Sequence, residues 1–266
     1  MDRRGAMRVP STFVIAVVAS LQSAQAPVRS PGPPTADLVA AVRAAYDTRG
    51  FTMRARLVTD SGGRETVVQI RALGRRDQTS SRVLYQALWP AAAKGRAAYL
   101  QRDTRQGLSG FLFQWPDTLT PLSDDRLSEP FLESALCLED LAEDFWSWPA
   151  PTAGADAIVE GQPCRIIEFR PPPATKSDYE RIRTCISPRK SLALSIEKIR
   201  RDGRIARRLV VKRTVKGENG RWAPVRIAVE DLERHRTTFV EVSKGERDIP
   251  VSLAEFSLSK IKSLGR

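Results

Sequence analysis

Short segments in which apolar and polar residues alternate run through most of this 266-residue chain and limit what it can fold into. Residues 51–58 and 66–73 alternate in this way, and Asp60-Ser61-Gly62-Gly63 between them predicts a hairpin turn. Further strands are expected at about 80–88, 95–102 and 109–115, and then from 157 to about 242. Because period two sends successive side chains to opposite faces of a sheet, the pattern predicts a mostly antiparallel β protein.

Two segments break this rhythm. After Gly32-Pro33-Pro34, residues 35–47 have an apolar stripe at helical spacing and predict an N-terminal helix. Residues 117–152 begin with proline and aspartate clusters and then predict a helix over 131–144. We therefore expect one domain over residues 35–266, of mainly β (α+β) class. It would be a single curved antiparallel sheet or unclosed β-barrel of about eleven strands, with a helical lid insertion at about 117–152.

The N-terminus has the three parts of a secretory signal. Arg3, Arg4 and Arg8 precede an apolar run, and Ala24-Gln25-Ala26 supplies a small-x-small cleavage pattern. We expect cleavage after residue 26, a flexible leader over 27–34, and a soluble periplasmic product. An uncleaved N-terminal anchor is the alternative.

The three cysteines suggest one disulfide in an oxidising compartment. Cys164 and Cys185 flank an expected hairpin with equal arms about the turn at Pro171-Pro172-Pro173. This arrangement favours a Cys164–Cys185 bond and leaves Cys137 over, although spacing alone leaves other pairings open.

The chain is basic, with 43 Lys and Arg against 31 Asp and Glu. Export excludes nucleic acid as the partner and leaves an anionic lipid surface, lipopolysaccharide phosphates or an acidic protein face. Nine basic residues gather between Ile196 and Lys216, on a hairpin that turns at Asp202-Gly203. A docking surface is predicted here, although a merely solvated hairpin explains the charges equally well. Its residues would be Arg200, Arg201, Arg204, Arg207 and Arg208.

Motifs for catalysis are missing from the sequence. The single histidine, His235, lies in an expected strand between two arginines, and no nucleophile, nucleotide-binding or zinc motif occurs. The carboxylate pairs Glu139-Asp140 and Glu143-Asp144 fall on the expected helix and are interpreted as a solvated acidic face. We predict a protein that is not an enzyme and has no metal or cofactor.

Eight of the fourteen Phe and Trp residues fall between positions 89 and 148. They would form either the core beneath a folded insertion or a lid over an apolar cavity, and composition does not separate the two. The predicted ligand contacts are Tyr85, Leu88, Trp89, Phe111, Phe113, Trp115, Phe131, Leu132, Leu136, Leu141, Phe145, Trp146 and Trp148.

Three stretches together resemble a known family: residues 84–100, with Lys94-Gly95, the segment Phe113-Gln114-Trp115-Pro116, and residues 131–141. Their order is similar to that of bacterial outer-membrane lipoprotein-sorting proteins, in an uncharacterised LolA-like branch, over about residues 34–260. The third stretch departs from the family pattern. It has Glu133 for Gly, Ala135 for Asp, Leu136 for an aromatic residue and Leu138 for Tyr.

The resemblance implies an unclosed antiparallel barrel around helices, with an apolar cavity for acyl chains. It further implies a non-catalytic, monomeric carrier that moves a lipid or lipoprotein between an inner-membrane exporter and an outer-membrane acceptor. Two alternatives stay open: an envelope sensor or regulatory module of related fold, and a polyanion-binding envelope protein without a cavity.

Overall fold

The computed structural model describes residues 33–46, 48–77, 80–103, 107–142, 145–173, 175, 177–217 and 219–263. The expected signal peptide and most of the expected leader lie outside these residues. Residues Pro33–Arg266 form one compact unit. Among the helices described, none is both long and apolar enough to cross a membrane.

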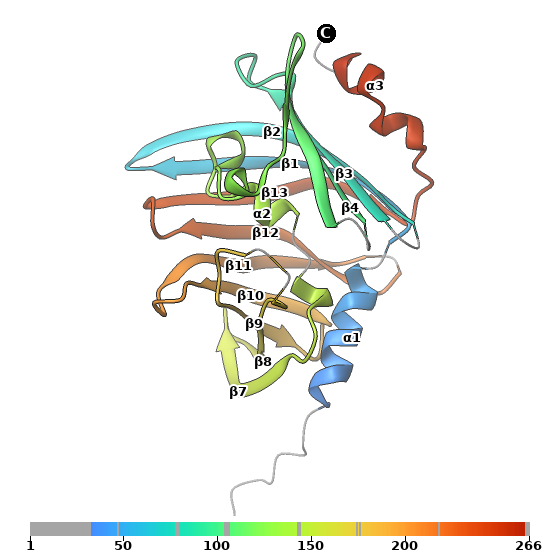
Figure 1. Cartoon of the computed structure of the whole chain (residues 1–266). Coiled ribbons are helices and arrows are strands. Elements are labelled where there is room, and N and C mark those ends of the chain that lie inside the picture. The colour runs from blue at the N-terminus through green and yellow to red at the C-terminus, as the bar shows by residue number, and fades with distance from the viewer. Residues whose placement is uncertain are drawn as a thin grey trace, which may run out of the picture. The chain divides into compact units, whose positions relative to one another are not determined.

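One antiparallel sheet contains all thirteen strands of the described residues, in the order β6-β5-β4-β3-β2-β1-β13-β12-β11-β10-β9-β8-β7 (Figure 1). The strands are β1 (Gly50–Ser61), β2 (Arg64–Arg76), β3 (Ser80–Trp89), β4 (Arg96–Asp103), β5 (Gly107–Gln114), β6 (Thr118–Pro121), β7 (Thr152–Val159), β8 (Gln162–Phe169), β9 (Arg181–Ser187), β10 (Leu192–Ile199), β11 (Ile205–Lys216), β12 (Trp222–Asp231) and β13 (Arg236–Arg247). The predicted sheet is confirmed, with more strands than the eleven expected; the four-residue β6 lies inside the segment assigned to the insertion.

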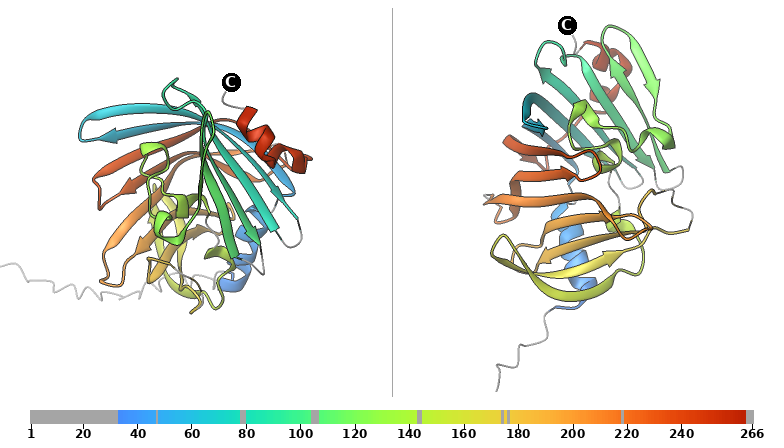
Figure 2. Two further views of the ribbon diagram at one scale, coloured as in Figure 1. Left: turned by 45° about the horizontal axis from the view of Figure 1, so that its top comes forward. Right: turned by 90° about the vertical axis from the view of Figure 1, so that its left-hand side faces the viewer.

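The strand order explains how the sheet stays open. Strands that follow one another in the chain are neighbours in the sheet, except for β6 and β7, and the first strand, β1, pairs with the last, β13, in the middle of the sheet. This leaves β6 and β7 as the two edges, and residues 122–151, here called the edge connection, join them. The sheet curves around the edge connection (Figure 2), and the face toward it is called the concave face.

The edge connection contains little regular helix. It holds the 3₁₀ helices η1 (Asp124–Arg126), η2 (Phe131–Glu133) and η3 (Phe145–Ser147), and the short helix α2 (Leu138–Leu141). The prediction of a helix over 131–144 is therefore wrong. Leu132 and Glu133 have φ of 50° and 60°, which a right-handed helix does not allow. Phe131 N donates to Leu136 O at 2.7 Å, and the Ser134 hydroxyl donates to Phe131 O at 2.6 Å, so local bonds replace the helical ones.

The remaining helices cover the sheet on both faces. Helix α1 (Thr35–Tyr46), which the sequence predicted, packs Leu38, Val39 and Val42 on the concave side of β8 and β9. The C-terminal η4 (Leu253–Phe256) and α3 (Leu258–Ser263) cover the convex face of β2–β5, where Phe256 and Ile261 are buried.

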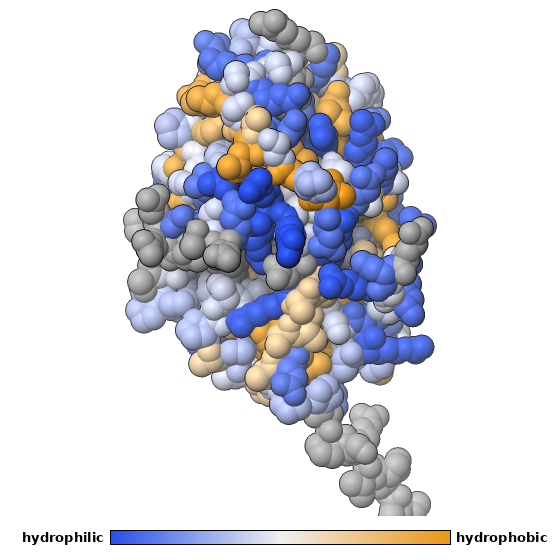
Figure 3. All heavy atoms as spheres, turned by 90° about the vertical axis from the view of Figure 1, so that its right-hand side faces the viewer, coloured by the Kyte–Doolittle hydropathy of each residue, from blue (hydrophilic) through white to orange (hydrophobic). Residues whose placement is uncertain are grey.

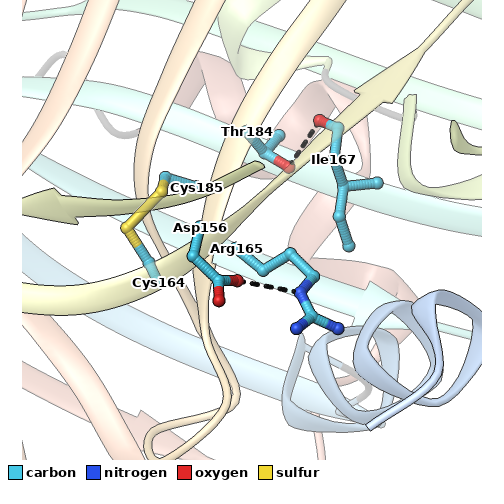
Figure 4. Close-up of a disulfide and its surroundings, with 6 residues drawn as sticks. All are labelled: Asp156, Cys164, Arg165, Ile167, Thr184 and Cys185. Carbon is cyan, nitrogen blue, oxygen red and sulfur yellow. Dashed lines mark hydrogen bonds and ion pairs between the residues drawn. A yellow bond between two sulfur atoms is a disulfide. The ribbon is translucent and has the colours of Figure 1, made fainter. Parts of the chain in front are cut away.

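A disulfide joins Cys164 on β8 to Cys185 on β9, as predicted, with 5.4 Å between the two Cα atoms. Next to it, Arg165 pairs with Asp156, and the Thr184 hydroxyl donates to Ile167 O (Figure 4). Cys137 is free and buried in the edge connection.

Candidate functional site

The concave face of β1–β5 is an apolar surface built in rows across the strands. The strand register places the members of each row side by side, and period two puts alternate rows on the same face. One row consists of Met53, Ala72, Tyr85, Ala98 and Leu112, and the next toward the Gly50 end consists of Phe51, Gly74, Val83, Leu100 and Gly110.

Apolar side chains of the edge connection lie on this surface. Phe131, Leu132, Leu136 and Leu138 are buried there in one cluster with residues of β1–β4, β12 and β13. The Phe131 ring meets the ring of Tyr85 edge-on, with 5.9 Å between centroids. The connection therefore covers this apolar part of the concave face.

Buried charges anchor the same segment to β10 and β11. Asp140 Oδ1 lies 2.7 Å from Lys198 Nζ, and Asp140 Oδ2 lies 3.2 Å from Arg207 Nη1. Arg207 Nη2 also lies 2.9 Å from Asp231 Oδ2 on β12. Each of these four side chains is at most 4% exposed. Removing one partner of a pair would leave an uncompensated charge in the core. These ion pairs, here called the anchor, therefore hold Asp140 of the edge connection in a defined position on β10 and β11.

Burial and charge set the protonation states in the anchor. Burial opposes ionisation of Asp140, but the Lys198 ammonium and the Arg207 guanidinium outweigh it and hold the pKa of Asp140 below its ordinary value. Burial raises the pKa of Glu139, and it raises the pKa of Cys137 to about 12. The Cys137 thiol is therefore neutral at physiological pH and is not an activated nucleophile.

These positions correct the interpretation of Glu139-Asp140 as a solvated acidic face, because Asp140 is buried and ion-paired. The sequence contained a pattern from which the basic ion-pair partners of Asp140 could have been predicted. Lys198 and Arg207 occupy inward-facing positions of β10 and β11, in phase with the partly buried Ile196 and Leu209. A basic residue on the apolar face of a strand implies a buried partner.

Backbone contacts fix further points of the edge connection. Ala135 N donates to the Thr238 hydroxyl at 2.8 Å, and Thr238 Oγ1 lies 2.8 Å from Thr59 Oγ1. Arg102 Nη2 donates to Ala142 O at 3.0 Å. In addition to their apolar contacts, residues 135–142 are thus held through polar groups that have defined directions.

The end of the edge connection is bound in another way. The Phe145 ring lies 4.5 Å from Trp146, 6.3 Å from Trp148 and 5.2 Å from Phe169 on β8, measured between centroids. Phe145 and Trp148 share a buried cluster with α1. Aromatic packing thus attaches the end of the connection, together with a hydrogen bond that Arg43 Nε on α1 donates to Trp146 O.

Two small cavities border the edge connection. The larger, of about 220 Å³, is lined by Arg96, Ala97, Leu112, Phe113, Gln114, Thr120, Arg126, Glu129, Pro130, Phe131, Leu132 and Leu138. The smaller, of about 140 Å³, is lined by Thr48, Phe51, Arg75, Arg76, Ser81, Arg82, Val83, Leu100, Arg102, Leu108, Leu141 and Ala142. Both are below the ~300 Å³ at which pockets for drug-sized ligands begin.

The predicted ligand contacts do not form one group. The concave group consists of Tyr85, Phe131, Leu132, Leu136 and Leu141, and the group against α1 consists of Phe145, Trp146 and Trp148. Phe111 and Phe113 pack with the C-terminal segment, although Phe113 also borders the larger cavity. Leu88 is half-buried, and Trp89 and Trp115 are 51% and 45% exposed. Clustering in sequence was misleading because neighbouring strand residues face opposite sides.

The predicted docking surface is largely neutralised. Arg207 does not belong to any surface, since it is 3% exposed. Arg208 stands in a ladder of alternating charges across five strands on the convex face, with ion pairs of 3.0–3.5 Å. The ladder runs Glu168, Arg183, Glu197, Arg208, Glu230.

The other members of the predicted docking surface surround the Asp202-Gly203 turn. Arg200 pairs with Glu233 at 2.8 Å and Arg204 with Asp202 at 2.6 Å. Arg201 is exposed and makes no ion pair within the part of the chain that the structure describes. His235 lies in the turn between β12 and β13 with φ of 49°, not in a strand as predicted.

Similar solved structures define the class of this fold. A DUF1329 family protein of Desulfovibrio piger has a TM-score of 0.78 at 18% identity, covering 85% of this chain and 96% of that one. A putative outer membrane lipoprotein-sorting protein domain of Vibrio parahaemolyticus has a TM-score of 0.77 at 15% identity, covering 85% and 97%. A LolA superfamily protein of Nitrosomonas europaea has a TM-score of 0.67 at 14% identity, covering 84% and 97%. The chain has the LolA-like fold.

A family model described as "Uncharacterized protein" matches residues 79–263, more than half of the chain. The chain belongs to that family. No curated protein matches it in sequence.

Proposed function

We propose that this protein is a non-catalytic carrier of the bacterial cell envelope that holds acyl chains of a lipid or lipoprotein against its concave face. The observation that carries the proposal is the apolar surface of β1–β5 beneath residues 131–141, with a cavity on each side of that segment. The LolA-like fold and the disulfide support an envelope role.

Loading would require residues 131–142 to move. The two cavities are too small for a long chain, but the leucine and phenylalanine side chains over the sheet can be exchanged for methylenes of similar polarity. Each methylene buried contributes about 0.8 kcal/mol, so one chain offsets much of the contact area that the segment gives up. The Asp140 anchor then determines how readily the segment leaves.

In the cell, the carrier would act in the periplasm and take its cargo from an inner-membrane exporter to an outer-membrane acceptor. The aqueous gap between two membranes demands a closed state that shields apolar surface. Residues 131–141 supply that closure in the unloaded protein, because they bury the surface of β1–β5 that would otherwise face water.

The test is native mass spectrometry of protein expressed in the periplasm, followed by solvent extraction and titration with a fluorescent fatty acid. We expect a co-purifying lipid or acylated peptide at near one-to-one ratio, or saturable fatty-acid uptake by the delipidated protein. A protein that is isolated empty and fails to take up fatty acid would contradict the carrier function.

A further inference from the structure

Two rows of side chains, here called the basic rows, cross the convex face of the sheet. Because Ala55 and Leu57 are buried on the concave face, Arg54 and Arg56 between and before them face the other side. In the first row, Arg54 on β1 stands between Arg71 on β2 and Lys244 on β13. The second row lies two residues further along β1, and its members are Arg213 on β11, Arg226 on β12, Glu241 on β13, Arg56 on β1 and Gln69 on β2.

The basic rows carry a surplus of positive charge. Two carboxylates form ion pairs with three of the six basic residues: Arg226–Glu241 at 3.3 Å, Arg56–Glu241 at 3.9 Å and Lys244–Glu246 at 2.8 Å. Within the described part of the chain, the remaining Arg54, Arg71 and Arg213 make no ion pair. This surplus distinguishes the basic rows from the ladder on β8–β12, in which acidic and basic residues alternate.

Like charges stand directly opposite each other in both rows. Arg54 has a basic residue on either side, and Arg213 stands opposite Arg226. Like charges at directly opposed positions destabilise a sheet. Because Arg54, Arg213 and Arg226 are exposed, an external anionic surface can reach them and offset this repulsion.

An exposed tryptophan lies at one end of the second row. The strand register continues from Gln69 to Trp89 at the end of β3, and the Trp89 side chain is 51% exposed. Trp115, which is 45% exposed, lies beside the turn that follows Trp89, because its N–H donates to Gly95 O at 3.1 Å. Figure 3 views the side that bears α3 and shows apolar residues in separate patches among hydrophilic ones. Exposed tryptophan next to basic residues is typical of surfaces that lie at a membrane–water interface.

We propose that the convex face docks on an anionic phospholipid bilayer through the basic rows, with Trp89 in the headgroup layer. The rows extend over five strands, from β2 to β11, which is about 19 Å at the usual spacing between neighbouring strands. This width fits a plane of many headgroups rather than one small anion. The six basic residues line neither cavity, so docking and cargo binding use separate surfaces. The inference therefore goes beyond the carrier function and does not depend on it.

The test is co-sedimentation of protein expressed in the periplasm with vesicles of phosphatidylcholine alone, or of phosphatidylcholine and phosphatidylglycerol in equal parts. We expect binding to the mixed vesicles only, and release at about 1 M salt, where charges are screened beyond about 3 Å. Arg54→Gln with Arg71→Gln should weaken this binding about thirtyfold, the effect of losing two basic contacts with an anionic surface. The two substitutions break no ion pair among the described residues, so urea unfolding should show unchanged or slightly higher stability.

The matched control is Arg189→Gln with Arg201→Gln, which removes the same charge from exposed residues in the turns at the two ends of β10. This pair should keep most of the binding. Equal binding of the wild type to both kinds of vesicle, or equal losses in the test and control variants, would overturn the inference. Fatty-acid uptake without vesicles, which tests the carrier function separately, should be the same in all variants. Uptake that falls together with vesicle binding would assign the basic rows to the cargo site and overturn the docking assignment.

A third arm separates a bilayer from an acidic protein. Polyglutamate should compete weakly with the mixed vesicles, because it offers no interface in which Trp89 can lie. Trp89→Ala should weaken binding to the vesicles and leave binding to polyglutamate unchanged. Polyglutamate that displaces the vesicles fully, together with a Trp89→Ala variant that binds them normally, would indicate an acidic protein partner and overturn the membrane assignment.

Discussion

The two parts of the edge connection attach to the same concave face through different sets of contacts. Residues 131–142 combine buried phenylalanine and leucine side chains with the Asp140 ion pairs and directed hydrogen bonds, and they border both cavities. Residues 145–148 are held mainly by aromatic rings that meet edge-on against β8, with a hydrogen bond from Arg43 of α1 to Trp146 O, and they line neither of those cavities. Directed polar contacts are lost as a unit when geometry changes, whereas apolar packing tolerates small shifts. Under the proposed carrier function, residues 131–142, which border the cavities, would move on loading, and residues 145–148 would stay in place.

The largest expected effect comes from Asp140→Asn. Lys198 and Arg207 would keep their charges in the core without the carboxylate, which costs about 3–5 kcal/mol of unfolding free energy. Urea unfolding measures the loss, and fatty-acid uptake by the folded fraction should become faster. Asp156→Asn, in the more exposed pair with Arg165, serves as control and should cost less than about 1 kcal/mol. If Asp140→Asn lost as little unfolding free energy as the control, the conclusion that these ion pairs anchor the segment would be wrong.

The matched variants Phe131→Ala and Phe145→Ala compare the contribution of residues 131–142 to ligand binding with that of residues 145–148. Both rings are buried, at 4% and 1% exposure, so each truncation should cost about 3–5 kcal/mol. Only Phe131→Ala should change the affinity for fatty acid, because only Phe131 borders a cavity on the concave face. Equal changes in affinity for the two variants would show that the edge connection acts as a single lid.

Removing the disulfide tests whether β8 and β9, near residues 145–148, take part in fatty-acid binding. Cys164→Ser with Cys185→Ser opens a link across 21 residues and should cost about 3 kcal/mol in thermal or urea unfolding. Fatty-acid affinity should stay unchanged, since the bond lies away from both cavities' lining residues. Altered affinity would place β8 and β9 in the binding site.

The smallest effect concerns Glu139. Burial raises the pKa of the folded carboxyl above its unfolded value, so the charged form opposes folding at neutral pH. Glu139→Gln should therefore raise the unfolding free energy slightly at pH 7, and this gain should shrink as the pH falls toward about 4, where the unfolded carboxyl also binds a proton. The exposed Glu160→Gln provides the control. A gain that does not depend on pH would contradict the assignment.

The sequence predicted the parts of the fold that local rules determine. Gly62 and Gly63, with φ of 62° and 84°, mark the β1–β2 turn, and Asp202-Gly203 marks the turn between β10 and β11. The equal arms around Pro171–Pro173 also located the Cys164–Cys185 bond correctly.

Prediction failed where distant residues decide the local structure. Residues 131–144 have helical spacing, yet Ala135 bonds to Thr238 and Asp140 pairs with Lys198 and Arg207. These partners are 58 to 103 positions away by their numbering and outweigh local helix propensity. For the same reason, Asp140 was interpreted as solvated and Arg207 as a docking residue.

The pairing of β1 with β13 has a consequence for the order of folding. The first strand of the sheet finds one of its two neighbours only when the last strand is present, since Phe51 stands opposite Arg247 and Ser61 opposite Arg236. Such non-local pairing is slow to form, because a long loop must close before the contact is gained. A chain that emerges N-terminus first would thus stay incomplete until its final strand arrives. Under the proposed envelope function, that delay suits a polypeptide that crosses a membrane unfolded. Truncation within β13 should therefore abolish the fold rather than shorten it.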